Sequence, residues 1–409
     1  MDTSFFYKGN FGLERETLRI DRYGRLARTP HPFPDDEHIT RDFCENQAEL
    51  ITPVYSSIDE AAASLGELDR RIKEVISKRG ESIWLYSNPP AFENESEIPI
   101  ARFTGSHISK KNYRVALQYR YGKRIMLLSG VHFNFSFTDD WLVGMYGKGA
   151  DSQDFKNRIY MRLYKQLMRH SWLIVLLTAA SAYYDRSFDS DGASGAVLSR
   201  YSSLRNSERG YWNSFIPVFD HTDLDSFCVG VLDLIRKSIL FSVSELYLPI
   251  RLKPKGLNSI ENLAEGGVDH IELRMFDLVP DKPLGIDTDD LKFAHLLILY
   301  LLTLPDTEFT EQQQIEAVRM HQTAALYDVG EDLIKRAQQL LSDMSEHFGG
   351  DAYAQSLIGY EAGKLRADKA KRFVNYYDRG EDNVRTAGLF RCGKDRSGGG
   401  VETVLCTQR

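Results

Sequence analysis

Two carboxylates, Glu14 and Glu16, stand two positions apart within residues 12–19. The pattern predicts a β-strand, in which side chains two positions apart share one face. Like charges at this spacing repel each other unless a cation offsets them, and a hard divalent ion such as Mg²⁺ is a common partner of paired carboxylates. The pair therefore suggests a metal site, and a solvated edge strand is the alternative for an isolated motif of this kind.

Further acidic and imidazole side chains occur in three other segments that read as strands. Asp42 precedes Glu49, and His132 lies in a run that alternates polar and aromatic residues. Glu272 stands two positions before Arg274. If the polar faces of these strands converge, five carboxylates and one imidazole meet few cations, and such a cluster stays ionised only around a metal. Oxygen-dominated ligation favours Mg²⁺ or Mn²⁺ over zinc.

Two arginines complement this acidic set. Arg205 lies in a polar loop and Arg274 lies beside Glu272. A guanidinium offers a planar fork of donors that suits phosphoryl oxygens, although a single arginine is more often part of a surface ion pair. Because Mg²⁺ held by carboxylates commonly contacts substrate phosphates, the combination is typical of ATP-using enzymes.

Other catalytic signals are weak. The segment from Gly388 to Lys394 matches part of a phosphate-binding loop, but Asp395 replaces the Ser or Thr that would hold Mg²⁺, and no apolar strand precedes it. The sequence has no GxSxG motif, and Cys44 has no visible histidine partner. A covalent hydrolase is therefore poorly supported.

Composition excludes several classes of protein. The 409 residues carry a net charge of −7, which disfavours a nucleic-acid binder that relies on neutralising the backbone. The four cysteines show no CxxC spacing, and the N-terminus has no signal-peptide pattern, so we expect a cytoplasmic protein with reduced thiols. The most apolar run, residues 172–184, is too short to cross a bilayer and predicts a buried helix, so no membrane partner is expected.

The elements that must position these side chains are mostly strands before residue 280. We expect strands around residues 12–19, near Glu49, and at 125–137, 246–252 and 268–278. Ser57 and Glu60 form a capping box ahead of a helix of about 20 residues. The pattern of residues 154–184 predicts a second, longer helix.

The remainder reads as helices followed by a Gly-rich end. Asp287 or Thr288 should cap an apolar helix over 291–304, and 310–378 is helical throughout with a break at Gly349. We therefore predict an α+β fold in which one curved antiparallel sheet has helices packed on its outer side. Residues 1–378 would form a single catalytic domain, sheet-rich to about 280 and helical over 287–378, and 379–409 a flexible tail.

Five blocks of the sequence, in the right order, resemble the bacterial glutamate-cysteine ligases. They are residues 12–19, 40–53, 129–136, 203–213 and 270–280, and the likeness extends over about residues 8–300. The resemblance implies a glutamine-synthetase-like sheet that curls into a funnel, with ATP and Mg²⁺ entering from one end. Its metal-binding positions correspond to Glu14, Glu16, Asp42, Glu49, His132 and Glu272.

The resemblance also implies roles for residues that contact the substrates. Arg205 and Arg274 match the arginines that contact phosphate, and with Glu272 they would hold the nucleotide. The pocket for the acceptor amine would comprise Phe43, Tyr113, Arg114, Leu117, Leu128 and Tyr211. The sequence departs from the family at Cys44, where Ser or Ala is usual, and at 179–184, which lacks a common proline. The chain is also shorter than the usual enzyme and too short to include a second, ATP-grasp domain.

The activity implied is ligation of the γ-carboxylate of glutamate to the amine of cysteine through a γ-glutamyl phosphate, the first step towards glutathione. Because the departures lie near the expected pocket, a ligase that uses another amino acid or amine as acceptor is the first alternative. A catalytically silent metal-binding or regulatory protein with the same fold is the second, because fold alone does not fix function.

Overall fold

The computed structural model describes residues 3–103, 108–367, 391–392 and 405–406. The predicted flexible tail of residues 379–409 lies outside the described residues, apart from the two short strands β10 (Arg391–Cys392) and β11 (Leu405–Cys406). The part of the predicted helical region that covers residues 368–378 also lies outside them.

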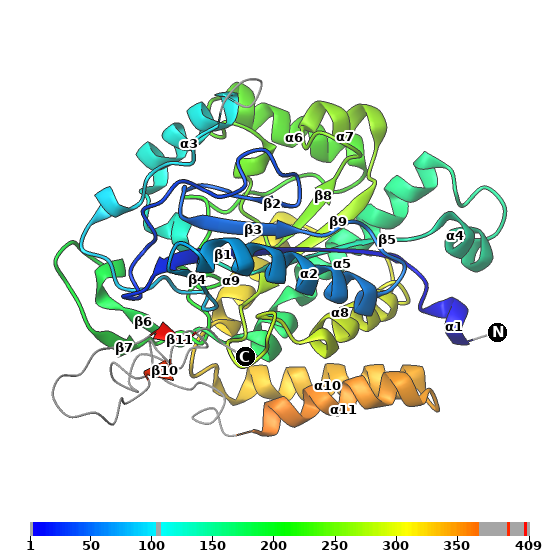
Figure 1. The fold of residues 1–409 in the computed structure, drawn as a ribbon. Coiled ribbons are helices and arrows are strands. Elements are labelled where there is room, and N and C mark those ends of the chain that lie inside the picture. Colours follow the sequence, from blue (N-terminus) through cyan, green and yellow to red (C-terminus); the bar gives the residue numbers. More distant parts are fainter. Residues whose placement is uncertain (1–2, 104–107, 368–390, 393–404, 407–409) are drawn as a thin grey trace, which may run out of the picture.

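One seven-stranded antiparallel sheet forms the centre of the molecule (Figure 1). Its order is β2-β3-β1-β5-β9-β8, and β4 pairs with the far end of β1. The strands are β1 (Asn10–Asp21), β2 (Ile39–Thr40), β3 (Gln47–Ile51), β4 (Glu81–Trp84), β5 (Val131–Ser136), β8 (Ile250–Lys253) and β9 (His270–Phe276). The twelve-residue strand β1 contacts three neighbours and therefore organises the sheet.

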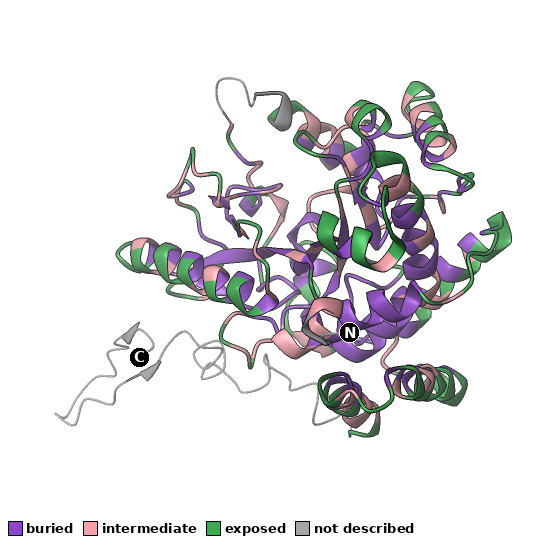
Figure 2. Ribbon diagram, turned by 90° about the vertical axis from the view of Figure 1, so that its right-hand side faces the viewer, coloured by how far each residue is buried: buried purple, intermediate pink, exposed green. Residues whose placement is uncertain are grey.

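The apolar face of the sheet packs against three helices, α2 (Ile58–Ser77), α5 (Gln153–Thr178) and α8 (Thr288–Leu301). Leu13 and Phe133 are among the side chains buried there. Figure 2 shows that the buried residues concentrate in this sheet and in the helices behind it. The Ser57 hydroxyl accepts a hydrogen bond from the Glu60 amide at the start of α2, as the sequence predicts, but the Glu60 carboxylate accepts from the Ser56 hydroxyl, so only this half of the predicted capping box forms. The α+β fold with helices on the outer side of the sheet is thereby confirmed.

The other helices surround this core. Helices α10 (Gly330–Phe348) and α11 (Ala352–Arg366) form a pair below the sheet in Figure 1, and α11 packs on α8. Helix α9 (Glu311–Ala324) packs along α5. Helices α3 (Ile108–Tyr121) and α6 (Leu224–Arg236) lie at the other end of the view. The shorter helices are α1 (Thr3–Phe6), α4 (Asp139–Tyr146) and α7 (Ile260–Gly266).

Besides the strand expected over 246–252, which begins only at Ile250, three predicted boundaries were wrong. The strand expected over 125–137 begins only at Val131, because Ile125–Leu127 forms a 3₁₀ turn. The helix expected to reach residue 184 ends at Thr178, and β6 (Tyr183–Asp185) then pairs with β7 (Ala196–Leu198). An apolar run does not distinguish a buried helix from a strand by its periodicity, so this end was not visible in the sequence.

The third error concerns the helical region after residue 310, which has a second break between α9 and α10. Gly330 has a φ of 74° there, and this left-handed conformation is one that glycine adopts at little cost. No helix among the described residues is long and apolar enough to cross a membrane.

Candidate active site

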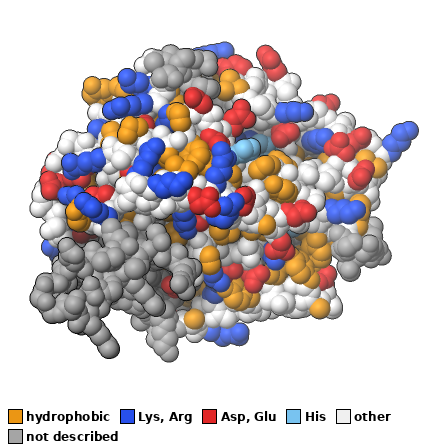
Figure 3. Space-filling view, in the orientation of Figure 1, with side chains coloured by type: hydrophobic (Ala, Val, Ile, Leu, Met, Phe, Trp, Pro, Cys, Tyr) orange, Lys and Arg blue, Asp and Glu red, His pale blue; other side chains and the backbone are white. Residues whose placement is uncertain are grey.

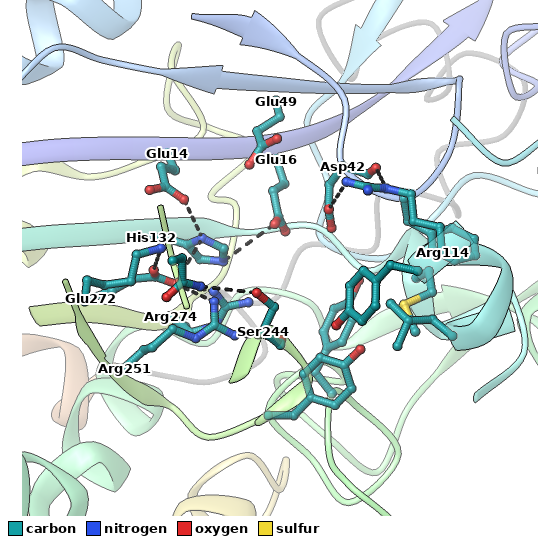
Figure 4. Close-up of a pocket in the computed structure, with 18 of the residues that line it drawn as sticks. Glu14, Glu16, Asp42, Glu49, Arg114, His132, Ser244, Arg251, Glu272 and Arg274 are labelled. Atoms are coloured by element: carbon teal, nitrogen blue, oxygen red, sulfur yellow. Dashed lines mark hydrogen bonds and ion pairs between the residues drawn. The ribbon is translucent and has the colours of Figure 1, made fainter. Parts of the chain in front are cut away.

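The register of the sheet places the acidic residues on one face. Glu16 lies directly opposite Glu49 in the pairing of β1 with β3, and Glu14 lies opposite His132 in the pairing of β1 with β5. Glu272 joins them from β9, one diagonal step from His132. Because residues directly opposed across an antiparallel pair share a face, these five side chains point into the same space (Figure 4).

That space is a cavity of about 420 Å³. All six predicted metal ligands line it, together with Arg274. The other lining residues are Phe43, Tyr113, Arg114, Leu117, Met126, Tyr211, Ser244, Tyr247, Arg251, Lys253, Leu257 and Asn258. The sheet thus supplies a charged wall, while α3 and the loops opposite it supply mostly aromatic and apolar groups.

His132 lies at the centre of the charged wall. Its Nδ1 atom is 3.2 Å from Glu14 Oε2 and 3.8 Å from Glu272 Oε1, and its Nε2 atom is 3.7 Å from Glu16 Oε1. One ligand atom from each of Glu14, His132 and Glu272 falls within 4.8 Å of the others. Burial acts to raise the pKa of Glu14, but the hydrogen bond with His132 brings it below its usual value.

Cations of the chain itself neutralise Glu272. Arg274 forms an ion pair with it, Lys253 Nζ lies 2.9 Å from its Oε2 atom, and Arg251 Nη1 lies 3.7 Å from its Oε1 atom. Burial alone would raise the pKa of Glu272, but these three charges hold it well below its usual range. This carboxylate is therefore ionised without further help.

Glu16 and Glu49 lack such compensation. Burial raises the pKa of Glu16. Burial also raises the pKa of Glu49 well above its usual range, and the negative charges of Asp42, Glu14 and Glu16 raise it further. Within the described part of the chain, no Lys or Arg forms an ion pair with either carboxylate. The His132 Nε2 atom, which faces Glu16, is buried and has no hydrogen-bond partner among the described residues. This donor set fits a hard divalent cation.

Asp42 and Arg114 form one edge of the cavity. Arg114 Nη2 lies 3.1 Å from Asp42 Oδ1, and Arg114 Nε donates to the Asp42 carbonyl. The guanidinium also lies over the ring of Phe103, 4.6 Å from its centroid. Asp42 is half-exposed, so this edge of the cavity reaches solvent, and Figure 4 shows Asp42 and Arg114 to one side of the other labelled carboxylates.

A sequence model described as "Glutamate-cysteine ligase" matches residues 1–228 and 217–324, which is most of the chain. The chain belongs to the glutamate-cysteine ligase family. A glutathione biosynthesis bifunctional protein, GshAB, of Listeria monocytogenes is 37% identical over 388 residues, which cover 90% of this chain and 48% of that protein. A glutamate-cysteine ligase of Clostridium acetobutylicum is 30% identical over 385 residues, covering 81% and 79% respectively. The chain spans about half the length of the bifunctional relatives that it matches.

Solved structures show the same fold. A glutamate-cysteine ligase of Francisella tularensis in complex with AMP superimposes with a TM-score of 0.80 at 23% identity, covering 93% of this chain and 88% of that one. A bifunctional glutathione synthetase of Pasteurella multocida gives a TM-score of 0.78 at 23% identity, covering 94% and 53%. The open antiparallel sheet with helices on its outer side is therefore shared with ligases of known structure.

Two predicted site residues of this family member lie beside the cavity rather than in its wall. Arg205 borders a smaller cavity of about 30 Å³, which shares Arg274 and Tyr211 with the larger one. Leu128 is fully buried and does not line the cavity, and its carbonyl oxygen accepts a hydrogen bond of 3.1 Å from the Tyr211 phenol. The other predicted ligand, phosphate and acceptor positions converge on the cavity of about 420 Å³.

Sequence reasoning missed several lining residues of the family member's cavity. Arg251 and Lys253 alternate along β8 and share the face of Glu272, so the same spacing argument that found Glu14 and Glu16 could have found them. Tyr247 and Met126 come from segments without regular periodicity. No sequence signal places these two residues in the cavity.

Proposed function

We propose that this chain is an ATP- and Mg²⁺-dependent ligase that joins the γ-carboxylate of L-glutamate to the amine of L-cysteine. The reaction would pass through γ-glutamyl phosphate and release ADP and phosphate. The observation that carries the proposal is the single face on which Glu14, Glu16, Glu49, His132 and Glu272 meet. The names of the relatives and the AMP bound by the Francisella ligase support the same substrate classes. We further propose that residues 1–378 form one catalytic domain.

The proposed metal ligands follow from the uncompensated charge. Glu16 and Glu49 form no ion pair with a Lys or Arg among the described residues, and Glu14, Asp42, His132 and Glu272 would complete the metal site around them. Mg²⁺, or Mn²⁺ in its place, would neutralise these carboxylates and bring phosphate oxygens to them. A cytoplasmic location is part of the proposal and agrees with the buried free thiols of Cys44 and Cys228.

The residues of the chain provide positioning and charge. A carboxylate is a poor electrophile, so the γ-carboxylate oxygen first attacks the γ-phosphorus of ATP and ADP leaves. Arg274, in the cavity wall, and Arg205, behind it, would stabilise the charge on the transferred phosphoryl group. The unprotonated amine then attacks the acyl carbon, phosphate leaves, and the amine proton passes to solvent or phosphate. Tyr113, Tyr211 and Tyr247 would exclude water from the acyl phosphate.

The proposed acceptor pocket is the aromatic and apolar side of the cavity. Phe43, Tyr113, Arg114, Leu117 and Tyr211 line it, and Leu128 supports it through Tyr211. Cys44, one of the two places at which the sequence departs from its family, is fully buried and does not border this cavity. The Cys44 thiol is therefore not part of the pocket wall, and cysteine remains the proposed acceptor.

A panel of acceptors tests this function. The chain would be incubated with ATP, Mg²⁺ and glutamate, and ADP and phosphate release would be measured with cysteine, other small amino acids and simple amines. We expect the highest kcat/KM with cysteine. Preference for an acceptor without a thiol would assign the chain to a different γ-glutamyl ligase, and no ADP with any acceptor would identify a silent homologue.

A further inference from the structure

The buried carboxylate of Asp277 has no role in the site described so far. It follows β9 directly and is only 1% exposed. Its Oδ2 atom accepts hydrogen bonds from the Ala180 amide (2.9 Å) and the Ser181 hydroxyl (2.6 Å), and its Oδ1 atom accepts one from the Ser203 hydroxyl (2.8 Å). Asp277 thus joins the end of β9, the turn after α5 and the loop that carries Arg205.

Arg205 is bound to an irregular part of β9. The pairing of β5 with β9 shifts register between Val131 and Phe133, where β9 contains one extra residue. Such a bulge turns backbone carbonyls away from the ladder. Arg205 Nη1 donates to the carbonyls of Arg274 and Phe276, at 2.8 Å each. The bulge therefore fixes the Arg205 side chain relative to the backbone of Arg274.

Asn206 connects this contact to Ser203. Its Nδ2 atom donates to the Met275 carbonyl at 2.8 Å and to the Ser203 hydroxyl at 2.8 Å. The Ser203 hydroxyl in turn donates to Asp277. On the other side, His321 Nε2 lies 3.3 Å from Asn206 Oδ1. A continuous set of hydrogen bonds thus runs from Asp277 to the segment that holds Arg205.

The guanidinium has little freedom to move. A Cβ atom added at Gly130 would overlap it, and one added at Gly210 would overlap the Arg205 backbone. Arg205 is also buried, which lowers its pKa, and the negative charge of Asp277 opposes this shift more strongly than that of Glu16. The position of Arg205 therefore depends on a carboxylate that does not border the large cavity.

We propose that Asp277 is a positioning residue that holds Arg205 against the β9 bulge, through Ser203 and Asn206, and balances its charge. The inference rests on the proposed function, because Arg205 would stabilise the transferred phosphoryl group. In Asp277→Asn, the new side-chain amide has two possible orientations. If its nitrogen faces the Ala180 amide, two donors oppose each other. If its nitrogen faces Ser203, it competes with Asn206 for the Ser203 hydroxyl. Either arrangement weakens the contact that positions Arg205.

A double-mutant cycle tests this role. Arg205→Ala should lower kcat by about 100-fold and Asp277→Asn by about 10-fold, with the KM for the acceptor amine unchanged, because only phosphoryl transfer is affected. In the Arg205→Ala background, Asp277→Asn should change kcat by less than about twofold, since its target is gone. Ser203→Ala, a milder change, should show the same dependence on Arg205 if Asp277→Asn fails to fold.

The matched control is Asp69→Asn. Asp69 is also buried, but its partner is Arg15, 2.5 Å away on the opposite face of the sheet. This variant should lower the melting temperature and leave kcat within about twofold. If the wild type is active but the effects of Asp277→Asn and Arg205→Ala on kcat are fully additive, the role of Asp277 is overturned and the proposed function is not. A wild type that forms no ADP would overturn the proposed function, and the inference with it.

Discussion

At the scale of single residues, the site divides into two halves with opposite electrostatic character. Glu272 is surrounded by Lys253, Arg251 and Arg274 and stays ionised. Glu16 and Glu49 face each other with no such partner, and their pKa values are raised mainly by burial. One half of the cavity is thus suited to anions such as phosphate, and the other to a metal ion.

Both halves should be needed for turnover. Replacing Glu14 or Glu272 with Ala removes a carboxylate within reach of His132 and should lower ADP formation by at least about 100-fold. Glu67→Ala is the control, because Glu67 is exposed on α2. The measurement is ADP release at saturating ATP, glutamate and cysteine. Turnover near the wild-type rate in either site variant would exclude the proposed arrangement.

At the scale of elements, the sequence showed which residues share a face but not which strands pair. The alternation around Glu14, His132 and Glu272 indicated the polar face of each strand correctly. Register depends on contacts far apart in the chain, such as Glu16 with Glu49. The contact of Ser203 with Asp277 joins two loops that no periodicity links. This is why the ligand set could be predicted while the hydrogen bonds that position Arg205 could not.

The apolar face of the sheet also contains a titratable group, His295 on α8. Its ring lies 4.9 Å from that of Phe11 and 5.0 Å from that of Phe135, and its Nε2 atom is buried without a hydrogen-bond partner. Burial lowers the pKa of His295 to about 3.

His295 should make the fold sensitive to acid. Because its pKa is lower in the folded state than in the unfolded state, the unfolded chain binds the extra proton, and stability falls as pH drops from about 6.5 towards 3. The loss should approach about 1.4 kcal/mol per pH unit for this one group. His295→Phe should flatten the dependence of the unfolding free energy on pH between 6 and 4, measured by denaturant titration.

The control for this experiment is His347→Gln, because His347 is exposed on α10. Three other buried histidines also have pKa values lowered by burial, namely His31, His221 and His321. The test therefore compares the slope of the unfolding free energy against pH in His295→Phe with the slope in the wild type. An unchanged slope in His295→Phe would show that this histidine does not titrate as the structure indicates.

At the scale of the whole molecule, the charge is distributed between surface and cavity. Acidic and basic side chains are interspersed on the face shown in Figure 3, so the described part of that face carries no continuous basic surface. Carboxylates and cationic side chains gather instead inside the large cavity, at the centre of the sheet. Metal binding would therefore stabilise the folded molecule as a whole, because the ligands come from strands distant in sequence.

Strands β1, β3 and β5 bring carboxylates and an imidazole together, and we expect this group of side chains to bind a divalent cation. Titration with Mn²⁺, followed by the electron paramagnetic resonance signal of the free ion, tests it most directly. The wild type should bind Mn²⁺ saturably, and Glu49→Gln should weaken binding by at least about tenfold, whereas the exposed-site variant Glu67→Gln should bind as the wild type does. Equal Mn²⁺ affinity in Glu49→Gln and the wild type would contradict the claim.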